Sequence, residues 1–246
     1  MGADAINLLI DAGNTRIKWG VHDGRGWSQA GAAETAASAT LADAWATLGP
    51  LKRATASNVA GERVQDDLFR ACGQRGIVLD VIRSPARQLG VTNGYREPSQ
   101  LGSDRWAALV AAHHAGRGHK LVVNAGTALT VDALADDGRF LGGLIVPGPA
   151  LMRRSLDRGT AGLRLTEGEF HDFPAATPDA ITSGAIQASA GAIGRLAERM
   201  AASGVPPSLI LLSGGAAREI APHLPIAHAI HENLVLDGLA LIARSS

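Results

Sequence analysis

The sequence lacks several features that mark common classes of protein. Its 246 residues include one cysteine, Cys72, which excludes an intramolecular disulfide and a cysteine-rich metal site. Aromatic residues make up only 4%, which argues against a surface that stacks the bases of single-stranded nucleic acid. Lys and Arg total 23, as do Asp and Glu, so no net field attracts nucleic acid or an anionic membrane. We therefore expect neither a nucleic acid nor a membrane among its partners.

Long apolar runs are also missing. The N-terminal MGADAINLLIDAGNTR has no basic leader, and its short apolar run stops at Asp11, unlike a secretory signal peptide. No other run approaches the roughly 20 residues of a transmembrane helix. We expect a soluble, cytoplasmic protein. Hydrophobic residues reach 46% and charged residues 19%, so the chain can bury a sizeable core in one large domain or two small ones.

Two segments of the chain resemble each other. LLIDAGNTRIKWGVHDGRGW (8–27) aligns with LVVNAGTALTVDALADDGRF (121–140) when one residue is inserted. The aligned pairs are Asp11 with Asn124, Gly13 with Gly126, and the turn Asp23-Gly24 with Asp137-Gly138. Each copy reads as strand, glycine turn and second strand, and helix-prone segments follow both. Two copies predict two related α/β halves with mixed sheets and flanking helices, although any two β-hairpins share some similarity.

Both glycine turns suit phosphate binding. Gly13 lets the backbone approach a phosphate, Asn14 and Thr15 add neutral donors, and Asp11 can hold hydrated Mg²⁺. The second turn offers Gly126 with Thr127. Two such turns facing one another would clamp a polyphosphate, as in the superfamily of actin, sugar kinases and a heat-shock chaperone (ASKHA). No G-x-x-x-x-G-K-[ST] motif occurs, so a P-loop is excluded.

Four segments, in order along nearly the whole chain, resemble type III pantothenate kinases. DAGNTRIK (11–18) is similar to their first phosphate motif, and Tyr95, Pro98 and GSDR (102–105) are similar to their pantothenate-binding segment. NAGTALTVD (124–132), followed by LGGLIVPG (141–148), resembles their second phosphate motif, and TPDAITSG (177–184) resembles their threonine motif. SGGAAR (213–218) stands where ASKHA proteins carry the glycine pair that packs against adenosine.

The resemblance implies ATP-dependent phosphorylation of pantothenate to 4'-phosphopantothenate, the first step of coenzyme A biosynthesis. It also implies two ribonuclease-H-like halves. Residues 1–117 would hold the first phosphate motif and the substrate segment, and residues 118–246 the second phosphate and adenosine motifs. A homodimer is expected by the same analogy. Two alternatives stay open: an ASKHA-fold kinase for another small hydroxyl substrate, and a regulatory accessory factor on a degenerate kinase fold.

The resemblance also assigns roles to individual residues. On spacing alone, a helix N-cap at Asp104 or Ser103 is the favoured interpretation; the resemblance reverses this, because Asp104 corresponds to the family's proposed general base. ATP phosphates would contact Asp11, which also carries Mg²⁺, and Gly13, Asn14, Thr15, Arg16, Lys18, Gly126 and Thr127. Pantothenate would contact Tyr95, Gly102, Ser103, Asp104, Arg105 and Thr177, with Arg105 available for bidentate binding of its carboxylate.

One position departs from the family pattern. The family usually has Asp where this chain has Asn124. An amide is a poorer ligand than a carboxylate for the monovalent cation, K⁺ or NH₄⁺, that the family uses. The sequence therefore leaves dependence on this cation open, while ATP binding is expected to survive.

Overall fold

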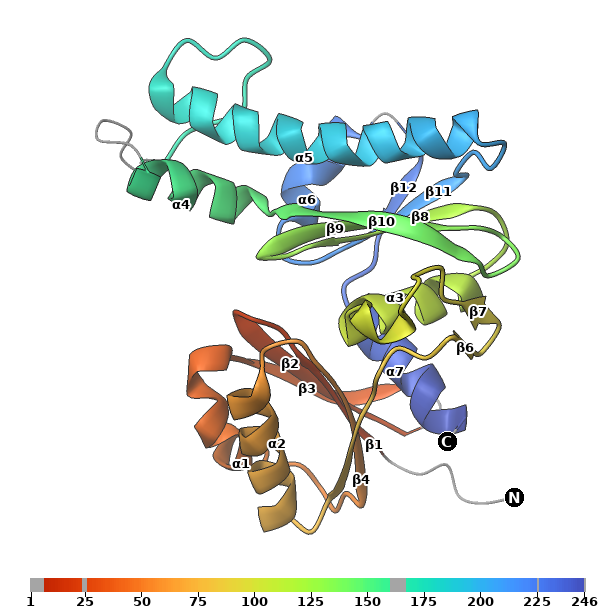
Figure 1. The fold of residues 1–246 in the computed structure, drawn as a ribbon. Coiled ribbons are helices and arrows are strands. Elements are labelled where there is room, and N and C mark those ends of the chain that lie inside the picture. The colour runs from red at the N-terminus through yellow and green to blue at the C-terminus, as the bar shows by residue number, and fades with distance from the viewer. Residues whose placement is uncertain (1–6, 24–25, 160–166, 225, 246) are drawn as a thin grey trace. The chain divides into compact units, whose positions relative to one another are not determined.

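The computed structural model describes residues 7–23, 26–159, 167–224 and 226–245 (Figure 1). Gly24 of the expected Asp23-Gly24 turn lies outside these residues. The chain divides into two compact units: unit 1 comprises Met1–Ala115 and Asn233–Ser246, and unit 2 comprises Gly116–Glu232. Each unit contains one five-stranded sheet.

The sheet of unit 1 is mixed. Its strands are β1 (Asn7–Ala12), β2 (Arg16–His22), β3 (Trp27–Glu34), β4 (Arg53–Asn58) and β5 (Val78–Val81). Their spatial order is β3-β2-β1-β4-β5. The first three strands pair antiparallel as consecutive hairpins, whereas β4 pairs in parallel with β1 and β5 in parallel with β4.

The sheet of unit 2 repeats this topology. Its strands are β8 (Lys120–Ala125), β9 (Ala128–Leu134), β10 (Phe140–Pro147), β11 (Leu209–Ser213) and β12 (His228–Ile230), in the order β10-β9-β8-β11-β12. Antiparallel and parallel pairs occupy the same places as in unit 1. The predicted α/β class with two related halves and mixed sheets is confirmed.

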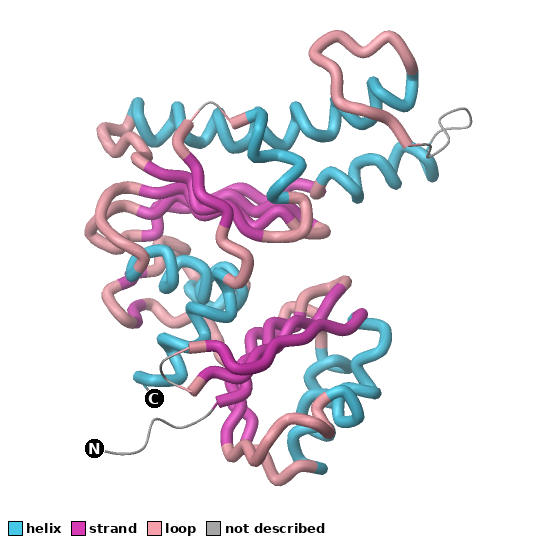
Figure 2. Tube along the Cα trace, turned by 180° about the vertical axis from the view of Figure 1, so that it is seen from behind, coloured by secondary structure: helices cyan, strands magenta, loops and turns pink. Residues whose placement is uncertain are grey.

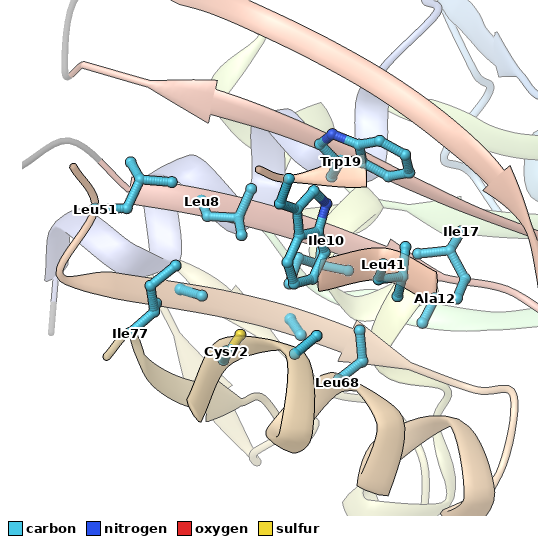
Figure 3. Packing of buried hydrophobic residues seen from close by; sticks show 14 of the residues in the cluster. Leu8, Ile10, Ala12, Ile17, Trp19, Leu41, Leu51, Leu68, Cys72 and Ile77 are labelled. Atoms are coloured by element: carbon cyan, nitrogen blue, oxygen red, sulfur yellow. The ribbon is translucent and has the colours of Figure 1, made fainter. Parts of the chain in front are cut away.

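Alternation of side chains along β1 determines what each face of its sheet packs against. Leu8, Ile10 and Ala12 are fully buried in a core shared with the helical side of unit 1 (Figure 3). That side consists of η1 (Thr35–Thr40), α1 (Leu41–Ala44) and α2 (Glu62–Gln74). Leu9 and Asp11 therefore face the opposite side of the sheet.

The final helix, α7 (Leu234–Ser245), belongs to unit 1, whereas the sequence-based division placed it in the C-terminal half. It packs against β1 and against α3 (Ser103–His114). Gly238 permits this packing because a Cβ there would collide with the Ala107 carbonyl. The Trp27 Nε1–H donates a hydrogen bond of 3.0 Å to Asp237 Oδ1. Tertiary contacts of this kind, rather than sequence order, determine the unit to which α7 belongs.

The helices of unit 2 are α4 (Pro149–Gly159), α5 (Thr177–Ala202) and α6 (Ala217–Ile220), with the 3₁₀ turn η3 (Ala221–His223). The long helix α5 lies along the sheet (Figure 2) and contributes Ile193, Ala197 and Met200 to its core. None of the helices in the described residues combines the length and the apolarity that crossing a membrane requires.

Candidate active site

Three polar side chains form a row on one face of the unit 1 sheet. Asp11 in β1 pairs with Lys18 in β2 and with Ser57 in β4. Directly paired residues point to the same face, so all three lie opposite the buried face formed by Leu8 and Ile10. The first phosphate motif thus presents its carboxylate and its lysine side by side.

A buried hydrogen bond joins this row to α3. The Ser57 and Ser103 hydroxyls lie 2.8 Å apart, and Ser103 is the first residue of the helix. Gly102 occupies the N-cap position and, as a glycine, has no side chain that could cap the helix. Neither Ser103 nor Asp104 is therefore the N-cap, which removes that alternative. Asp104 Oδ1 instead accepts a 2.8 Å hydrogen bond from the Arg105 backbone N–H.

Asp11 and Asp104 influence each other's protonation. The pKa of Asp11 is raised to about 7, mainly by burial and also by the negative charge of Asp104, while the charge of Lys18 opposes the rise. Burial also raises the pKa of Asp104, although the Arg105 backbone N–H and the Arg105 charge oppose the rise. At Asp104 the effect of burial is therefore larger than the opposing effects of Arg105. The structure brings the two carboxylates of separate motifs into one site.

Backbone and side-chain hydrogen bonds, two of them from Thr35, fix the conformation of the first glycine turn. Gly13 N–H donates to the Arg16 carbonyl at 3.1 Å, which closes the turn. The Thr35 hydroxyl donates to the Gly13 carbonyl at 2.6 Å, and Thr35 N–H donates to the Thr15 carbonyl at 3.0 Å. Asn14, Thr15 and Arg16 remain exposed. Sequence reasoning missed both Thr35 and Ser57, whose only sequence signal is a small hydroxyl residue at or just beyond a strand end.

The substrate segment folds into a short loop before α3. It contains the two-residue strands β6 (Arg87–Gln88) and β7 (Val91–Thr92) and the 3₁₀ turn η2 (Pro98–Gln100). Arg105 is only 5% exposed. Its Nη1 donates to the Tyr95 hydroxyl at 2.9 Å, and its guanidinium carbon lies 5.6 Å from the centre of the tyrosine ring. The predicted pair Tyr95 and Arg105 is thus in direct contact.

In unit 2, three separate segments meet at the second glycine turn. Gly126 N–H donates to the Ala128 carbonyl at 3.0 Å, and Gly148 N–H donates to the Thr127 carbonyl at 2.9 Å. Gly214, with φ of +98°, approaches so closely that a Cβ would lie 2.5 Å from the Ala125 carbonyl oxygen. The second phosphate motif, the end of LGGLIVPG and the glycine pair of SGGAAR therefore lie together.

The two units place equivalent residues in equivalent rows. Asn124 in β8 pairs with Thr130 in β9 and with Ser213 in β11. This row matches that of Asp11, Lys18 and Ser57, strand for strand. Among the predicted substrate residues, Thr177 stands apart: it is an exposed residue at the start of α5 in unit 2, whereas the others lie in unit 1.

Comparison with the sequences of known proteins identifies the family. A family model described as type III pantothenate kinase matches residues 7–199. The chain belongs to the type III pantothenate kinase family. A type III pantothenate kinase from Nitrosospira multiformis is 47% identical over 240 residues, covering 97% of this chain and 91% of the relative. Another from Aromatoleum aromaticum is 47% identical over 237 residues, covering 96% and 97%.

Solved structures agree on the fold. A ROK family glucokinase from Streptomyces griseus superposes with a TM-score of 0.54, at 13% identity, covering 98% of this chain and all of the glucokinase chain. At that identity the likeness concerns architecture alone. Within the type III pantothenate kinase family, this member therefore combines the family's sequence motifs with the fold of a sugar kinase, and it carries Asn124 in its second phosphate motif.

Proposed function

We propose that the protein transfers the γ-phosphate of ATP to the primary hydroxyl of pantothenate, forming 4'-phosphopantothenate in the first step of coenzyme A biosynthesis. The observation that carries this proposal is the link between the two motifs in unit 1: Asp11 pairs with Ser57, whose hydroxyl lies 2.8 Å from that of Ser103, the residue before Asp104. Phosphoryl transfer needs a cation site at the phosphates and a group beside it that takes the proton of the attacking hydroxyl. Membership of the family supplies the choice of substrate.

The residues present fit a magnesium–ATP complex. No group of three or more His, Cys, Asp or Glu in the described parts of the chain could hold a metal by itself. Mg²⁺ in kinases needs no such cage, because it binds through one or two carboxylates, water and the substrate phosphates. Asp11 would supply that carboxylate, and Mg²⁺ held there would supply positive charge beside the phosphates. The phosphates contact Gly13, Asn14, Thr15, Arg16 and Lys18, and on the second motif Gly126 and Thr127.

Asp104 is proposed as the general base. A carboxylate whose pKa is raised by burial accepts a proton more readily than an exposed one, which suits this role near neutral pH. Arg105 is proposed to bind the pantothenate carboxylate, supported by its contact with Tyr95. Gly102, Ser103 and Thr177 are proposed to complete the pocket by family resemblance.

The remaining assignments rest on family resemblance. We propose a homodimer acting in the cytoplasm, with no role for nucleic acid or membrane. A monovalent cation, K⁺ or NH₄⁺, is proposed to bind near Asn124, with weaker dependence than in members that carry aspartate.

A panel of hydroxyl compounds tests the proposed function. ATP-dependent phosphorylation is measured for pantothenate, several hexoses, glycerol and serine at equal concentrations. We expect turnover with pantothenate alone. Turnover confined to a hexose or glycerol would show that this compound, and not pantothenate, is the substrate. Binding of ATP without turnover of any compound would favour an accessory factor on a degenerate kinase fold.

A further inference from the structure

One buried amide organises the loop that carries Tyr95. The Asn93 side chain is 9% exposed. Its Nδ2 donates to the carbonyls of Pro85, at 3.3 Å, and Pro98, at 3.2 Å. Its Oδ1 accepts a 3.0 Å hydrogen bond from Tyr95 N–H. Both donor hydrogens and the acceptor are used, so this single side chain ties the two ends of the loop to the backbone of Tyr95.

The loop in turn orients Arg105. The Tyr95 hydroxyl accepts from Arg105 Nη1, and the tyrosine ring lies against the guanidinium. Arginine has a long side chain with several rotatable bonds, so contacts that fix its planar fork reduce the entropy lost when it binds a carboxylate. A shift of Tyr95 would remove one of the contacts that orient the guanidinium, without removing its charge. The hydrogen bonds thus run in sequence from Asn93 through Tyr95 to Arg105.

We infer that Asn93 is a positioning residue that sets the preference for a substrate carrying a carboxylate, acting through Tyr95 on Arg105. The inference rests on the proposed function. It assigns recognition of the carboxylate end to a buried amide outside the four family-like segments. The chemical step, at the other end of the substrate, does not depend on Asn93.

The test compares pantothenate with its neutral primary amide, which carries the same hydroxyl. The ratio of kcat/KM for pantothenate to kcat/KM for the amide measures carboxylate recognition. A general loss of stability would lower both values and leave this ratio unchanged. Asn93→Asp keeps the acceptor for Tyr95 N–H but places carboxylate oxygens against the Pro85 and Pro98 carbonyls. Tyr95→Phe leaves the loop intact and removes only the hydroxyl. We expect each variant to lower the ratio by about tenfold, mainly through the KM for pantothenate, with the KM for ATP within about twofold of wild type.

Asn58→Asp is the matched control. Asn58 also holds a loop with its amide, donating to the Gly61 carbonyl at 3.0 Å and accepting from Ala60 N–H at 3.0 Å, but it lies outside the substrate segment. The ratio of kcat/KM for pantothenate to that for the amide should be the same in Asn58→Asp as in wild type. An unchanged ratio in Tyr95→Phe, or in a folded Asn93→Asp, would overturn the inference, as would a wild type that phosphorylates both compounds equally well. A wild type that phosphorylates neither compound would overturn the proposed function as well.

Discussion

At the scale of single residues, Asp11 and Asp104 are two carboxylates in one site with different surroundings. Asp11 is paired across the sheet with Lys18, whereas Asp104 is beside Arg105 at the start of a helix. Both have raised pKa values because burial disfavours their charged forms. Burial of two neighbouring carboxylates disfavours their charged forms despite these cations, so a metal ion bound at Asp11 would relieve part of this cost.

Replacement of Asp104 by asparagine tests its proposed role as a base. Asp104→Asn keeps the size of the side chain and its acceptor for Arg105 N–H but cannot take a proton. We expect kcat to fall by roughly 10²-fold or more, with ATP affinity unchanged. Steady-state kinetics and ATP titration measure the two quantities. Near-normal turnover would show that Asp104 is not the base.

The pKa of Asp11 predicts a pH-dependent stability in the metal-free protein. The folded pKa of about 7 lies above the ordinary value of 3.8 for an aspartate, so between these pH values the folded state retains a proton that the unfolded state has lost. The free energy of unfolding should therefore fall as pH rises from about 4 to about 7 and then level off. Asp11→Asn removes this contribution together with its coupling to Asp104. Urea unfolding at pH 5 and pH 7.5 should show a smaller pH effect in the variant; identical pH effects would contradict the raised pKa.

Replacement of Asn124 by aspartate tests the effect of the amide at a position where the family usually has aspartate. A formal charge attracts a cation far more strongly than an amide dipole in a partly dry site. The wild type should therefore depend weakly on K⁺, and Asn124→Asp should increase that dependence. Activity is titrated with KCl against a large organic cation at constant ionic strength. Strong K⁺ activation of the wild type, unchanged in the variant, would show that backbone carbonyls determine the cation site.

At the scale of elements, local patterns predicted the strands and turns well. The short apolar run that ends at Asp11 and the glycine at 13 predict a strand and a turn because both are properties of adjacent residues. The bond between Ser57 and Ser103 was not predictable in this way, since it requires the parallel pairing of β1 with β4 and the docking of α3. Thr35 was missed for the same reason, because its partners lie about twenty residues away in the chain.

Close packing of the glycine pair against the second phosphate turn gives a prediction for unit 2. Gly214→Ala would place a Cβ 2.5 Å from the Ala125 carbonyl oxygen at a φ of +98°. We expect destabilisation by roughly 1–3 kcal/mol and a higher KM for ATP. Gly215→Ala is the matched control, because its Cβ would meet nothing within 4 Å. Circular dichroism melts and ATP kinetics measure both effects; equal behaviour of the two variants would contradict the packing argument.

At the scale of the whole molecule, the division of the chain does not follow its order. The sequence repeat predicted two related halves, and the two sheets share one topology. The apolar sequence near Leu234 to Ala243 predicts a helix but not its partner, since an apolar helix fits any apolar surface of matching shape. Gly238 against Ala107 supplies that match in unit 1. The chain thus returns to its first unit after completing the second.

Removal of α7 should therefore destabilise unit 1 selectively. The helix buries Leu234, Val235, Leu236, Leu239 and Ile242. Each such side chain contributes roughly 1.5–3 kcal/mol, so their sum is comparable with the about 5–15 kcal/mol that stabilises a typical protein. All four tryptophans, Trp19, Trp27, Trp45 and Trp106, lie in unit 1, so their fluorescence reports that unit alone. In a chain ending at Glu232, we expect the urea midpoint of tryptophan emission to fall strongly or the transition to vanish, while far-ultraviolet circular dichroism retains a transition from unit 2. Gly238→Ala should lower the tryptophan midpoint less. Loss of the circular dichroism transition with an unchanged tryptophan midpoint would instead assign α7 to unit 2.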